Sequence, residues 1–227
     1  MKVTLPSVTL LAFTAVVLSN FNSRPANPTA DFNYPEGYAI GDVAQSFQLR
    51  NYDGRTIGLE DYPSAKGFII VFTSNHCPYA EAYEDRLIAL HRKFADRGFP
   101  LIAINPNAPE INPLDNMEAI KKRARLKRFP FPYLSDSLQQ VFPMYGADRT
   151  PHVFVLDSLR HVRYMGTIDD NAEASHKVTK RYVEEAIHAL MEGDEPSPST
   201  TKTVGCKIRL MERRVSNNPK IIEKTEG

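Results

Sequence analysis

The sequence predicts an α/β protein with a mixed central sheet, helices on both faces of that sheet and a β-hairpin at its N-terminal side. Short apolar runs typical of buried strands alternate with amphipathic helical stretches. An Asp53-Gly54 pair separates two strand-like segments, and two adjacent strand-like runs followed by a helix close the folded region. The 227 residues suffice for one domain with a hydrophobic core and looser ends.

The first half of the expected domain contains the hairpin, a central strand and a long helix. Segments 47–50 and 56–59 flank the Asp-Gly turn, which is a strong hairpin signal. An apolar run at 68–73 predicts a buried strand, and a helix is predicted at about 78–96 with Gly98 ending it. The apolar face of this helix comprises Tyr83, Leu87, Leu90 and Phe94.

The second half continues the alternation of strands and helices and closes with a hairpin and a helix. We expect a strand at 99–105, a helix at 115–128, an extended piece at 131–134, a helix at 138–145, strands at 152–156 and 161–165, and a helix at 172–192. Gly193 is expected to cap the last helix.

The two ends of the chain differ in composition from its centre. Residues 1–19 contain a short apolar run typical of a secretory signal peptide, and an uncleaved anchor that tethers the chain to a membrane is the alternative. We expect a linker at 20–36, the domain at 37–193 and an extended tail at 194–227. The predicted location is therefore outside the cytoplasm, in the periplasm or another extracytoplasmic compartment.

Cys77 is the most informative residue for function. It follows the strand-like run at 68–73 and precedes Pro78, a residue type favoured at the first position of a helix. Unpaired N–H groups and the macrodipole at a helix N-terminus favour an anion, and the thiolate is the reactive form of cysteine. Polar neighbours predict that the helix start is exposed; a buried structural thiol is the alternative.

Charge and motifs exclude several other classes. The formal net charge is +1, so the basic run at 121–128 is interpreted as a solvated helix face rather than a nucleic-acid site. The sequence contains no Gly-rich phosphate loop, no His-Glu-X-X-His and no nucleophilic serine motif. We expect no organic cofactor and no metal.

Several short motifs between residues 37 and 208 form a recognisable set. They are Gly41-Asp42-Val43-Ala44, Asn75-His76-Cys77-Pro78-Tyr79, Phe131-Pro132-Tyr133-Leu134, Tyr145-Gly146-Ala147, Thr150-Pro151-His152, Gly166-Thr167-Ile168-Asp169-Asp170 and Thr203-Val204-Gly205-Cys206-Lys207-Ile208. Together they resemble the thioredoxin-like superfamily, in its redoxin or peroxiredoxin-like branch of alkyl hydroperoxide reductase and thiol-specific antioxidant proteins. Within that branch the chain is similar to a subgroup with a single-cysteine Cys-Pro-Tyr-Ala motif and a C-terminal Gly-Cys-X-Ile motif.

This resemblance implies a thioredoxin-like fold and roles for individual residues. Cys77 matches the attacking cysteine of the thioredoxin Cys-X-X-Cys pair. Pro151 matches the cis-proline that faces the active-site sulfur, so Thr150 would offer its backbone to a substrate strand. Ala80 replaces the second cysteine, and a mixed disulfide therefore needs another resolving thiol. Cys206 could serve if the tail folds back over the helix start.

Other departures from the family patterns weaken a direct transfer of activity. The peroxidatic cysteine of peroxiredoxins would fall at Ala80 rather than Cys77, and Thr73 has the wrong spacing for their Thr-X-X-Cys motif. Val71 stands where thioredoxin carries a buried aspartate. The resemblance therefore supports the fold more strongly than either the dithiol or the peroxidatic cycle.

Several roles stay open at this level. The two cysteines could form a redox-active pair or a permanent disulfide, or could never meet. His76, Pro78 and Tyr79 are supporting candidates, and His76 could stabilise a thiolate, move a proton or be an ordinary loop residue. His152 could approach the site or serve the structure. A metal site built from Cys77, His76 and His152 is disfavoured, because it offers adjacent ligands and a single sulfur.

We therefore expect a thiol–disulfide oxidoreductase in which Cys77 attacks and Cys206 resolves. Its substrate would be a protein thiol or disulfide, and a protein donor would supply the electrons. The first alternative is a thiol peroxidase for small peroxides, in which Cys77 becomes a sulfenic acid and condenses with Cys206. The second is a peptide-binding module that keeps the fold without turnover.

Overall fold

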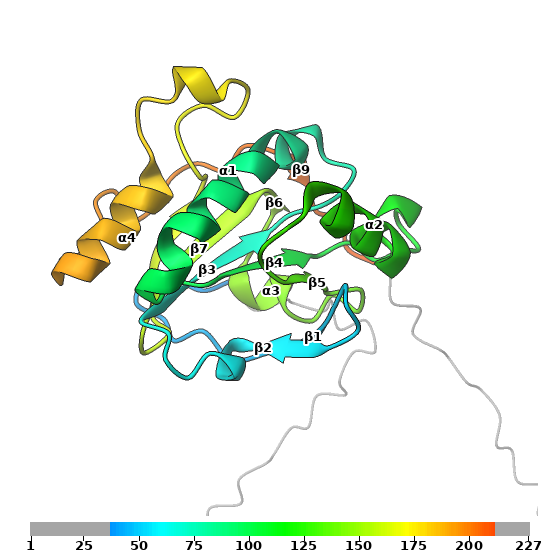
Figure 1. Ribbon diagram of the computed structural model, residues 1–227, viewed down its shortest axis with the longest axis horizontal. Coiled ribbons are helices and arrows are strands. Elements are labelled where there is room, and N and C mark those ends of the chain that lie inside the picture. Colours follow the sequence, from blue (N-terminus) through cyan, green and yellow to red (C-terminus); the bar gives the residue numbers. More distant parts are fainter. Residues whose placement is uncertain (1–36, 212–227) are drawn as a thin grey trace, which may run out of the picture. The chain divides into compact units, whose positions relative to one another are not determined.

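The computed structural model describes residues 37–211, which form a seven-stranded mixed sheet with helices on both faces (Figure 1). The strand order is β2-β1-β5-β4-β3-β7-β8, with β3–β4 and β4–β5 parallel and the other neighbours antiparallel. The strands are β1 (Gln48–Asn51), β2 (Thr56–Gly58), β3 (Gly67–Phe72), β4 (Leu101–Asn105), β5 (Tyr133–Ser135), β7 (His152–Asp157) and β8 (Val162–Gly166). The predicted fold class is confirmed.

The central strand β3 is buried along its whole length and separates two hydrophobic cores. Its side chains alternate between them, as the period of two in a strand requires. Ile69 and Val71 belong to one core, whereas Phe68, Ile70 and Phe72 belong to the other. Burial on both faces explains why the sequence shows a continuous apolar run here instead of a polar–apolar alternation.

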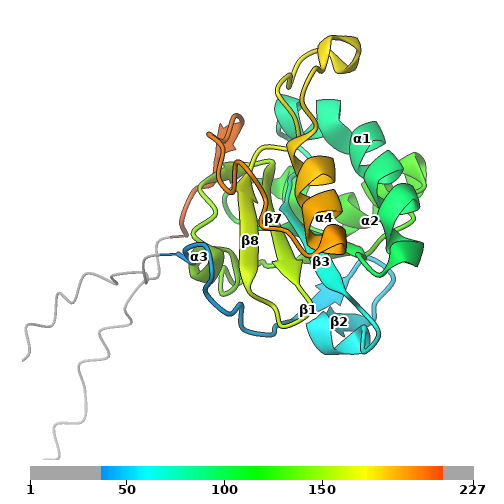
Figure 2. The ribbon, with the colours of Figure 1, turned by 90° about the vertical axis from the view of Figure 1, so that its left-hand side faces the viewer.

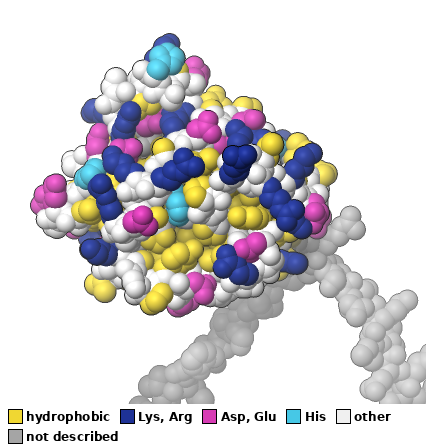
Figure 3. All heavy atoms as spheres, in the orientation of Figure 1, with side chains coloured by type: hydrophobic (Ala, Val, Ile, Leu, Met, Phe, Trp, Pro, Cys, Tyr) yellow, Lys and Arg dark blue, Asp and Glu magenta, His cyan; other side chains and the backbone are white. Residues whose placement is uncertain are grey.

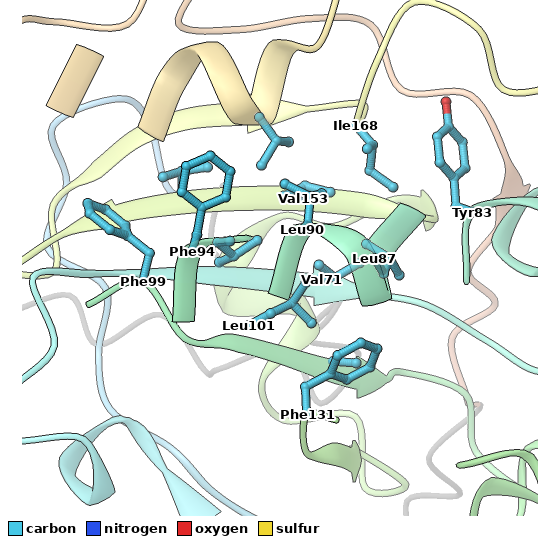
Figure 4. Close-up of a cluster of buried hydrophobic side chains, with 14 of the residues drawn as sticks. Val71, Tyr83, Leu87, Leu90, Phe94, Phe99, Leu101, Phe131, Val153 and Ile168 are labelled. Carbon is cyan, nitrogen blue, oxygen red and sulfur yellow. The ribbon is translucent and has the colours of Figure 1, made fainter. Parts of the chain in front are cut away.

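Three helices cover one face of the sheet: α1 (Pro78–Phe94), α2 (Met117–Lys127) and α4 (Tyr182–Glu192). In Figure 4, Leu87 and Leu90 of α1 point toward the sheet at Val71 and Val153. Complete burial of a side chain of this size contributes about 1.5–3 kcal/mol. This packing fixes α1, and with it the position of the residue that precedes its first turn.

The opposite face carries the short helix α3 (Phe142–Tyr145) and the chain segment that leads into the hairpin. Figure 2 shows α3 on the other side of the sheet from α1 and α4. Tyr145 fills the space above the sheet, with its ring centroid 5.3 Å from that of Phe72 and 5.1 Å from that of Phe154. The second core also contains Ile208 from the C-terminal segment, so this segment packs against the domain.

The N-terminal hairpin is confirmed at β1 and β2, where Leu49 pairs with Ile57. Its turn contains Gly54 at φ +93°, a conformation that glycine adopts without steric cost. β1 also pairs with β5, which attaches the hairpin to the central sheet.

Two predicted helices begin later than expected. The helix predicted at 138–145 starts only at Phe142, because the Asp136 carboxylate binds backbone N–H groups of residues 140–142 and Gln139 adopts φ +53°. The helix predicted at 172–192 starts only at Tyr182, and a loop with a short 3-10 turn precedes it. In that loop, the Asp170 carboxylate accepts hydrogen bonds from the backbone and hydroxyl of Thr179, which compete with a helical backbone.

A second, two-stranded sheet was not predicted. It pairs β6 (Arg149–Thr150) with β9 (Cys206–Lys207) in antiparallel orientation. A two-residue strand in a polar tail carries no hydrophobic period, so the sequence pattern could not reveal it.

Other predictions concern residues that the structure does not describe. The signal peptide or anchor at 1–19 and the linker at 20–36 lie outside the described residues, as does the end of the tail after residue 211. Among residues 37–211, no helix is long and apolar enough to cross a membrane.

The basic run at 121–128 lies on α2 and its C-terminal end and makes ion pairs with α1. Arg123 Nε lies 2.5 Å and Lys127 Nζ 2.9 Å from the carboxylate oxygens of Glu84. Figure 3 shows Lys and Arg side chains interspersed with Asp and Glu over this view of the molecule. Arg123 and Lys127 of the run therefore link α2 to α1 through Glu84. The run is thus a helix face with paired charges and not a uniform basic patch.

Candidate redox site

Cys77 lies at the junction between β3 and α1, where it is the N-cap residue of the helix. Its backbone is extended, its carbonyl accepts a hydrogen bond from the Glu81 amide at 2.9 Å, and Pro78 is the first helical residue. Pro78 and Tyr79 are exposed, as expected for the helix start, but Cys77 itself is 0% exposed, which matches the alternative of a buried thiol. The loop before β7 and the C-terminal segment lie against this thiol, as the following contacts show.

The loop before β7 supplies the first contact with Cys77. The Thr150–Pro151 peptide bond is cis, and the Cys77 thiol donates a hydrogen bond to the Thr150 carbonyl oxygen at 2.9 Å. The hydroxyl groups of Ser74 and Thr150 are 3.0 Å apart. The turn after β3 and the turn before β7 are thus tied together around the sulfur.

The C-terminal segment brings the second cysteine to the same place. Cys206 on β9 pairs directly with Thr150 on β6 (Figure 1). Both cysteines are free thiols; Cys77 is buried and Cys206 is half-buried. Burial, and after it the neighbouring Cys77 side chain, raise the pKa of the Cys206 thiol to about 12. The two residues therefore share one site although 129 positions separate them in the sequence.

Gly205 allows β9 to approach β6 this closely. A Cβ atom at Gly205 would lie 2.1 Å from the carbonyl oxygen and 2.7 Å from the carbonyl carbon of Thr150. Only glycine lacks this atom, so the contact requires it. The Gly205 carbonyl in turn accepts a hydrogen bond from the Arg149 guanidinium at 2.9 Å.

Further contacts hold residues 203–211, which we call the C-terminal strap. The Ile208 amide donates to the Asp148 carbonyl at 2.9 Å, and the Ile208 side chain is buried in the second core. The Gln139 side chain donates to the Arg209 carbonyl at 2.8 Å and accepts from the Met211 amide at 2.6 Å. The strap is thus held on both sides of Cys206: by Arg149 at Gly205 before it, and by Asp148 and Gln139 after it.

A buried carboxylate, that of Asp115, contacts the two residues that precede Cys77. Asp115 closes the 3-10 turn η3 (Pro113–Asp115), and its side chain is fully buried. One of its oxygens accepts from the Asn75 amide at 2.9 Å and from the Asn105 side chain at 2.8 Å. The other contacts Nδ1 of His76 and accepts from the Asn107 side chain at 3.1 Å. Asp115 therefore fixes the ring of the histidine that precedes Cys77.

A cavity of about 300 Å³ connects this carboxylate cluster with the strap. Its lining residues are His76, Asn107, Ile111, Asn112, Cys206, Lys207 and Arg209. The cavity thus has an imidazole, a thiol and two cationic side chains on its wall. Cys77 is not among the lining residues, in keeping with its complete burial.

Two further candidates, Tyr79 and His152, differ in burial: the first is exposed and the second is buried. Tyr79 is exposed on the first turn of α1. His152 pairs with Phe72 across β3 and β7, and its ring centroid lies 4.5 Å from that of Phe154. Burial lowers the pKa of His152 to about 4, the Asp148 carboxylate opposing this only in part. His152 is thus a neutral core histidine at neutral pH.

Sequence reasoning missed Asp115 and Gln139 as parts of the site. A signal for Asp115 existed, because His76 follows β3 and Asn105, Asn107 and Asp115 end or follow β4. The carboxyl ends of neighbouring parallel strands meet at one edge of a sheet, so these polar residues could have been expected together. No pattern pointed to Gln139, which became visible only through the position of the strap.

The family model for AhpC/TSA matches residues 40–165, more than half of the 227-residue chain. The chain belongs to the AhpC/TSA family. The matched segment contains Cys77 and the Thr150–Pro151 bond, whereas Cys206 lies beyond it.

Individual relatives of this AhpC/TSA protein agree with the fold. The chain is 34% identical to an uncharacterized conserved protein from Geobacillus kaustophilus, with a TM-score of 0.71 over 77% of this chain and 94% of that structure. A candidate thiol:disulfide interchange protein DsbE from Chlorobium tepidum matches with a TM-score of 0.53 and 18% identity, over 69% of this chain and 98% of that one. The thioredoxin-like fold is thereby confirmed.

One curated relative carries the name of an activity. Thiol-disulfide oxidoreductase ResA from Halalkalibacterium halodurans is 24% identical to this AhpC/TSA protein over 117 residues. The match covers 52% of this chain and 62% of ResA, less than two thirds of that relative's length.

Within residues 37–211, no group of three or more His, Cys, Asp or Glu side chains could hold a metal ion.

Proposed function

We propose that this protein is a thiol–disulfide oxidoreductase in which Cys77 is the attacking thiol and Cys206 the resolving thiol. The observation that carries this proposal is the direct pairing of Cys206 with Thr150, whose carbonyl also accepts the Cys77 hydrogen bond. This arrangement supplies the second thiol that Ala80 cannot provide. The similarity to a thiol-disulfide oxidoreductase supports the same reaction class.

The cycle balances with two thiols and one substrate disulfide. The Cys77 thiolate attacks one sulfur of the substrate disulfide, and the other substrate sulfur leaves as a thiolate. Cys206 then loses its proton and attacks the Cys77 sulfur of the mixed disulfide, which releases the second substrate thiolate. The substrate is reduced by two electrons, and the protein holds a Cys77–Cys206 disulfide. A donor dithiol reduces this bond by the same exchange chemistry.

The position of Cys77 suits the first step. The sulfur lies at the N-terminus of a 17-residue helix, whose dipole favours an anion, and the hydrogen bond that the thiol donates to the Thr150 carbonyl is given up when the thiolate forms. When the Cys77–Cys206 disulfide is reduced, Cys77 is for the same reason the better leaving group of the two. The donor thiol would therefore attack the half-buried Cys206 sulfur rather than the buried Cys77 sulfur.

Substrate access requires a change at the strap. β9 occupies the edge at Thr150, where a substrate strand would pair in the thioredoxin superfamily. A protein substrate therefore has to displace residues near Cys206 before it reaches Cys77. We propose protein thiols or disulfides as substrates, a protein electron donor, an exported location and no organic cofactor or metal.

A thiol peroxidase is the second candidate function. The complete burial of Cys77 favours it, because a small peroxide reaches a covered thiol more readily than a protein does. Cys77 would reduce the peroxide to an alcohol or water and become a sulfenic acid, and condensation with Cys206 would form the disulfide and release water. The name of the AhpC/TSA family fits this reading too.

The decisive test is a non-reducing peptide mass map of the reduced full-length protein. One sample receives one equivalent of an oxidised protein disulfide, and the other receives one equivalent of hydrogen peroxide. A Cys77–Cys206 link formed faster with the protein disulfide supports the oxidoreductase, and the reverse order supports the peroxidase. Two unmodified thiols in both samples would overturn both functions and leave a binding module.

A further inference from the structure

We propose that His76, held by Asp115, is the acid–base group for Cys206: it takes the thiol proton when Cys206 attacks and returns a proton to the leaving group. This inference rests on the proposed function, because it assigns the proton transfer in the resolving step. The thiol concerned is that of Cys206, not that of Cys77, which directly follows His76 in the chain.

The hydrogen bonds of Asp115 define the state of the imidazole. Asn75, Asn105 and Asn107 all donate N–H groups to its two oxygens, so the carboxylate acts purely as an acceptor. The remaining contact, with Nδ1 of His76, then requires the ring proton on Nδ1. In the neutral ring Nε2 is therefore the basic atom.

The imidazole of His76 and the thiol of Cys206 border the same cavity. Asp115 is fully buried and holds the Nδ1 edge of the ring, while 29% of the His76 side chain remains exposed. His76 and Cys206 both line the cavity of about 300 Å³ beneath the strap. A base here shares the cavity with the thiol that must be deprotonated, and the cavity has room for a water molecule that could carry the proton.

Cys206 needs a base more than an ordinary cysteine does. Its thiol is half-buried against Cys77, and burial raises its pKa. At neutral pH almost none of it is thiolate, although the thiolate is the attacking species. A neighbouring imidazole, whose ordinary pKa of about 6.5 lies near neutrality, can accept the proton during the attack.

The step balances for both candidate reactions. The Cys206 proton moves to Nε2 of His76 while the Cys206 sulfur attacks the Cys77 sulfur. If Cys77 carries a substrate sulfur, that sulfur leaves with the bonding electron pair and receives the proton from the imidazolium. If Cys77 is a sulfenic acid, hydroxide leaves and the imidazolium proton converts it to water. In each case His76 returns to its starting state.

Several charged groups set the basicity of His76. Asp115 on η3 stabilises the imidazolium, whereas Lys207 and Arg209 on the strap side line the same cavity and disfavour it. A Cys77 thiolate, next along the chain, would favour the imidazolium.

The test measures Cys206 alone, in the full-length Cys77→Ser protein. Its reaction with 5,5′-dithiobis(2-nitrobenzoate) is followed by stopped flow as a function of pH. We expect an inflection in the range where histidine ordinarily titrates, because neutral His76 assists the attack. His76→Gln should remove this inflection and slow the reaction at neutral pH by about 10²-fold, the lower end of acid–base effects.

His161 supplies a matched control. It also pairs through Nδ1 with an aspartate, Asp157, at 3.1 Å, and its side chain is 27% exposed, but it lies between β7 and β8, at the end of β7 opposite to His152. His161→Gln should leave the Cys206 rate unchanged. Equal rates in the His76→Gln and His161→Gln proteins would overturn the proposal.

The experiment separates this proposal from the proposed function. The Cys77→Ser background contains no redox pair, so the pH profile of Cys206 reports on His76 whether or not Cys77 is catalytic. If the His76→Gln protein fails to fold, that profile still decides: a single rise confined to alkaline pH overturns the proposal. Failure of Cys77 to react in the wild-type protein would overturn the proposed function alone.

Discussion

The two cysteines lie in regions that are held in different ways. Cys77 follows a strand buried at all six positions and precedes a 17-residue helix, so its backbone belongs to the core. Cys206 lies on a two-residue strand outside the main sheet, held by hydrogen bonds and by Ile208. One sulfur thus has a fixed position, and the other depends on contacts that can be broken singly.

This difference matches the demands of a two-thiol cycle. The attacking thiol has to meet every substrate with the same geometry, which a core position provides. The resolving thiol has to make room for the substrate and then return to the first sulfur. A strap held by separable contacts suits that role, because local opening costs less free energy than unfolding of the core.

Removal of the fixed sulfur should have the largest effect. We predict that Cys77→Ser abolishes disulfide exchange, because a hydroxyl group is a far poorer nucleophile than a thiolate. Cys206→Ser should keep the first step and accumulate a mixed disulfide at Cys77. Mass spectrometry of protein quenched during the reaction distinguishes the two variants. A mixed disulfide that clears normally in Cys206→Ser would contradict the assignment of the resolving thiol.

Displacement of the strap should have the next largest effect. In Gly205→Ala the new Cβ would lie 2.1 Å from the Thr150 carbonyl oxygen, so β9 has to move away from β6. We predict at least a ~10-fold slower Cys77–Cys206 linkage and faster alkylation of Cys77, at a cost of about 1–3 kcal/mol in the free energy of unfolding. Quenched peptide maps measure the linkage rate.

Gly54→Ala is the control for general destabilisation. Gly54 also has a positive φ, but no atom lies within 4 Å of its added Cβ and it belongs to the distant hairpin. It should lose stability without a change in cysteine linkage. If both variants linked their cysteines at the same rate, close pairing of β9 with β6 would not be needed for resolution.

The sequence predicted the secondary structure around Cys77, whereas for Cys206 it predicted only a possible return of the tail and not the strand that carries this cysteine. The apolar run of β3 and the helical period of α1 dictate a strand-to-helix turn at Cys77, because burial of those side chains determines the local structure. The pattern of β7 and β8 likewise predicted the closing hairpin. These elements depend on many apolar contacts, which leave a period in the sequence.

The parts that escaped prediction depend on single polar contacts. The pairing of Cys206 with Thr150 rests on the absence of a Cβ at Gly205 and on bonds to backbone groups. Cys77 is completely buried, which its polar sequence neighbours did not indicate. The position of Asp115 is likewise defined by contacts from two other segments, Asn75 and His76 after β3 and Asn105 at the end of β4. Such contacts leave no periodic trace.

Acid should lower the free energy of unfolding through His152, which is buried beside the site. His152 titrates at a pKa of about 4 in the folded protein because it is buried, whereas an unfolded histidine titrates near 6.5. Between pH 6.5 and pH 4 the unfolded chain therefore binds the proton that the folded protein excludes. We predict that the free energy of unfolding falls across this window by up to about 3 kcal/mol through His152 alone.

His152→Phe tests this prediction, since phenylalanine has a similar volume and no titrating group. Urea unfolding at several pH values should show a shallower loss of stability between pH 6.5 and pH 4 in the variant than in the wild type. Asp157, whose pKa is lowered by hydrogen bonds from Arg163 and other donors despite partial burial, loses its contribution below this window. An unchanged slope would show that His152 binds its proton as readily in the folded protein as in the unfolded chain.

The smallest effect is expected at the end of the strap, where the Gln139 side chain binds Arg209 and Met211. Gln139 is 1% exposed, and its amide binds the carbonyl groups of Pro106 and Arg209 and the amide of Met211. Gln139→Ala leaves these groups without their partner, and we predict a loss of about 1–2 kcal/mol in the free energy of unfolding.

Because the strap loosens without leaving the site, Cys77 should be alkylated several-fold faster in Gln139→Ala while the first exchange step stays unchanged. The neighbouring exposed residue supplies the control, and Gln140→Ala should alter neither stability nor alkylation. Alkylation rates with iodoacetamide, read by mass spectrometry, decide the matter. A stability loss with no gain in Cys77 reactivity would mean that Gln139 supports the loop after β5 and that the strap covers Cys77 without its help.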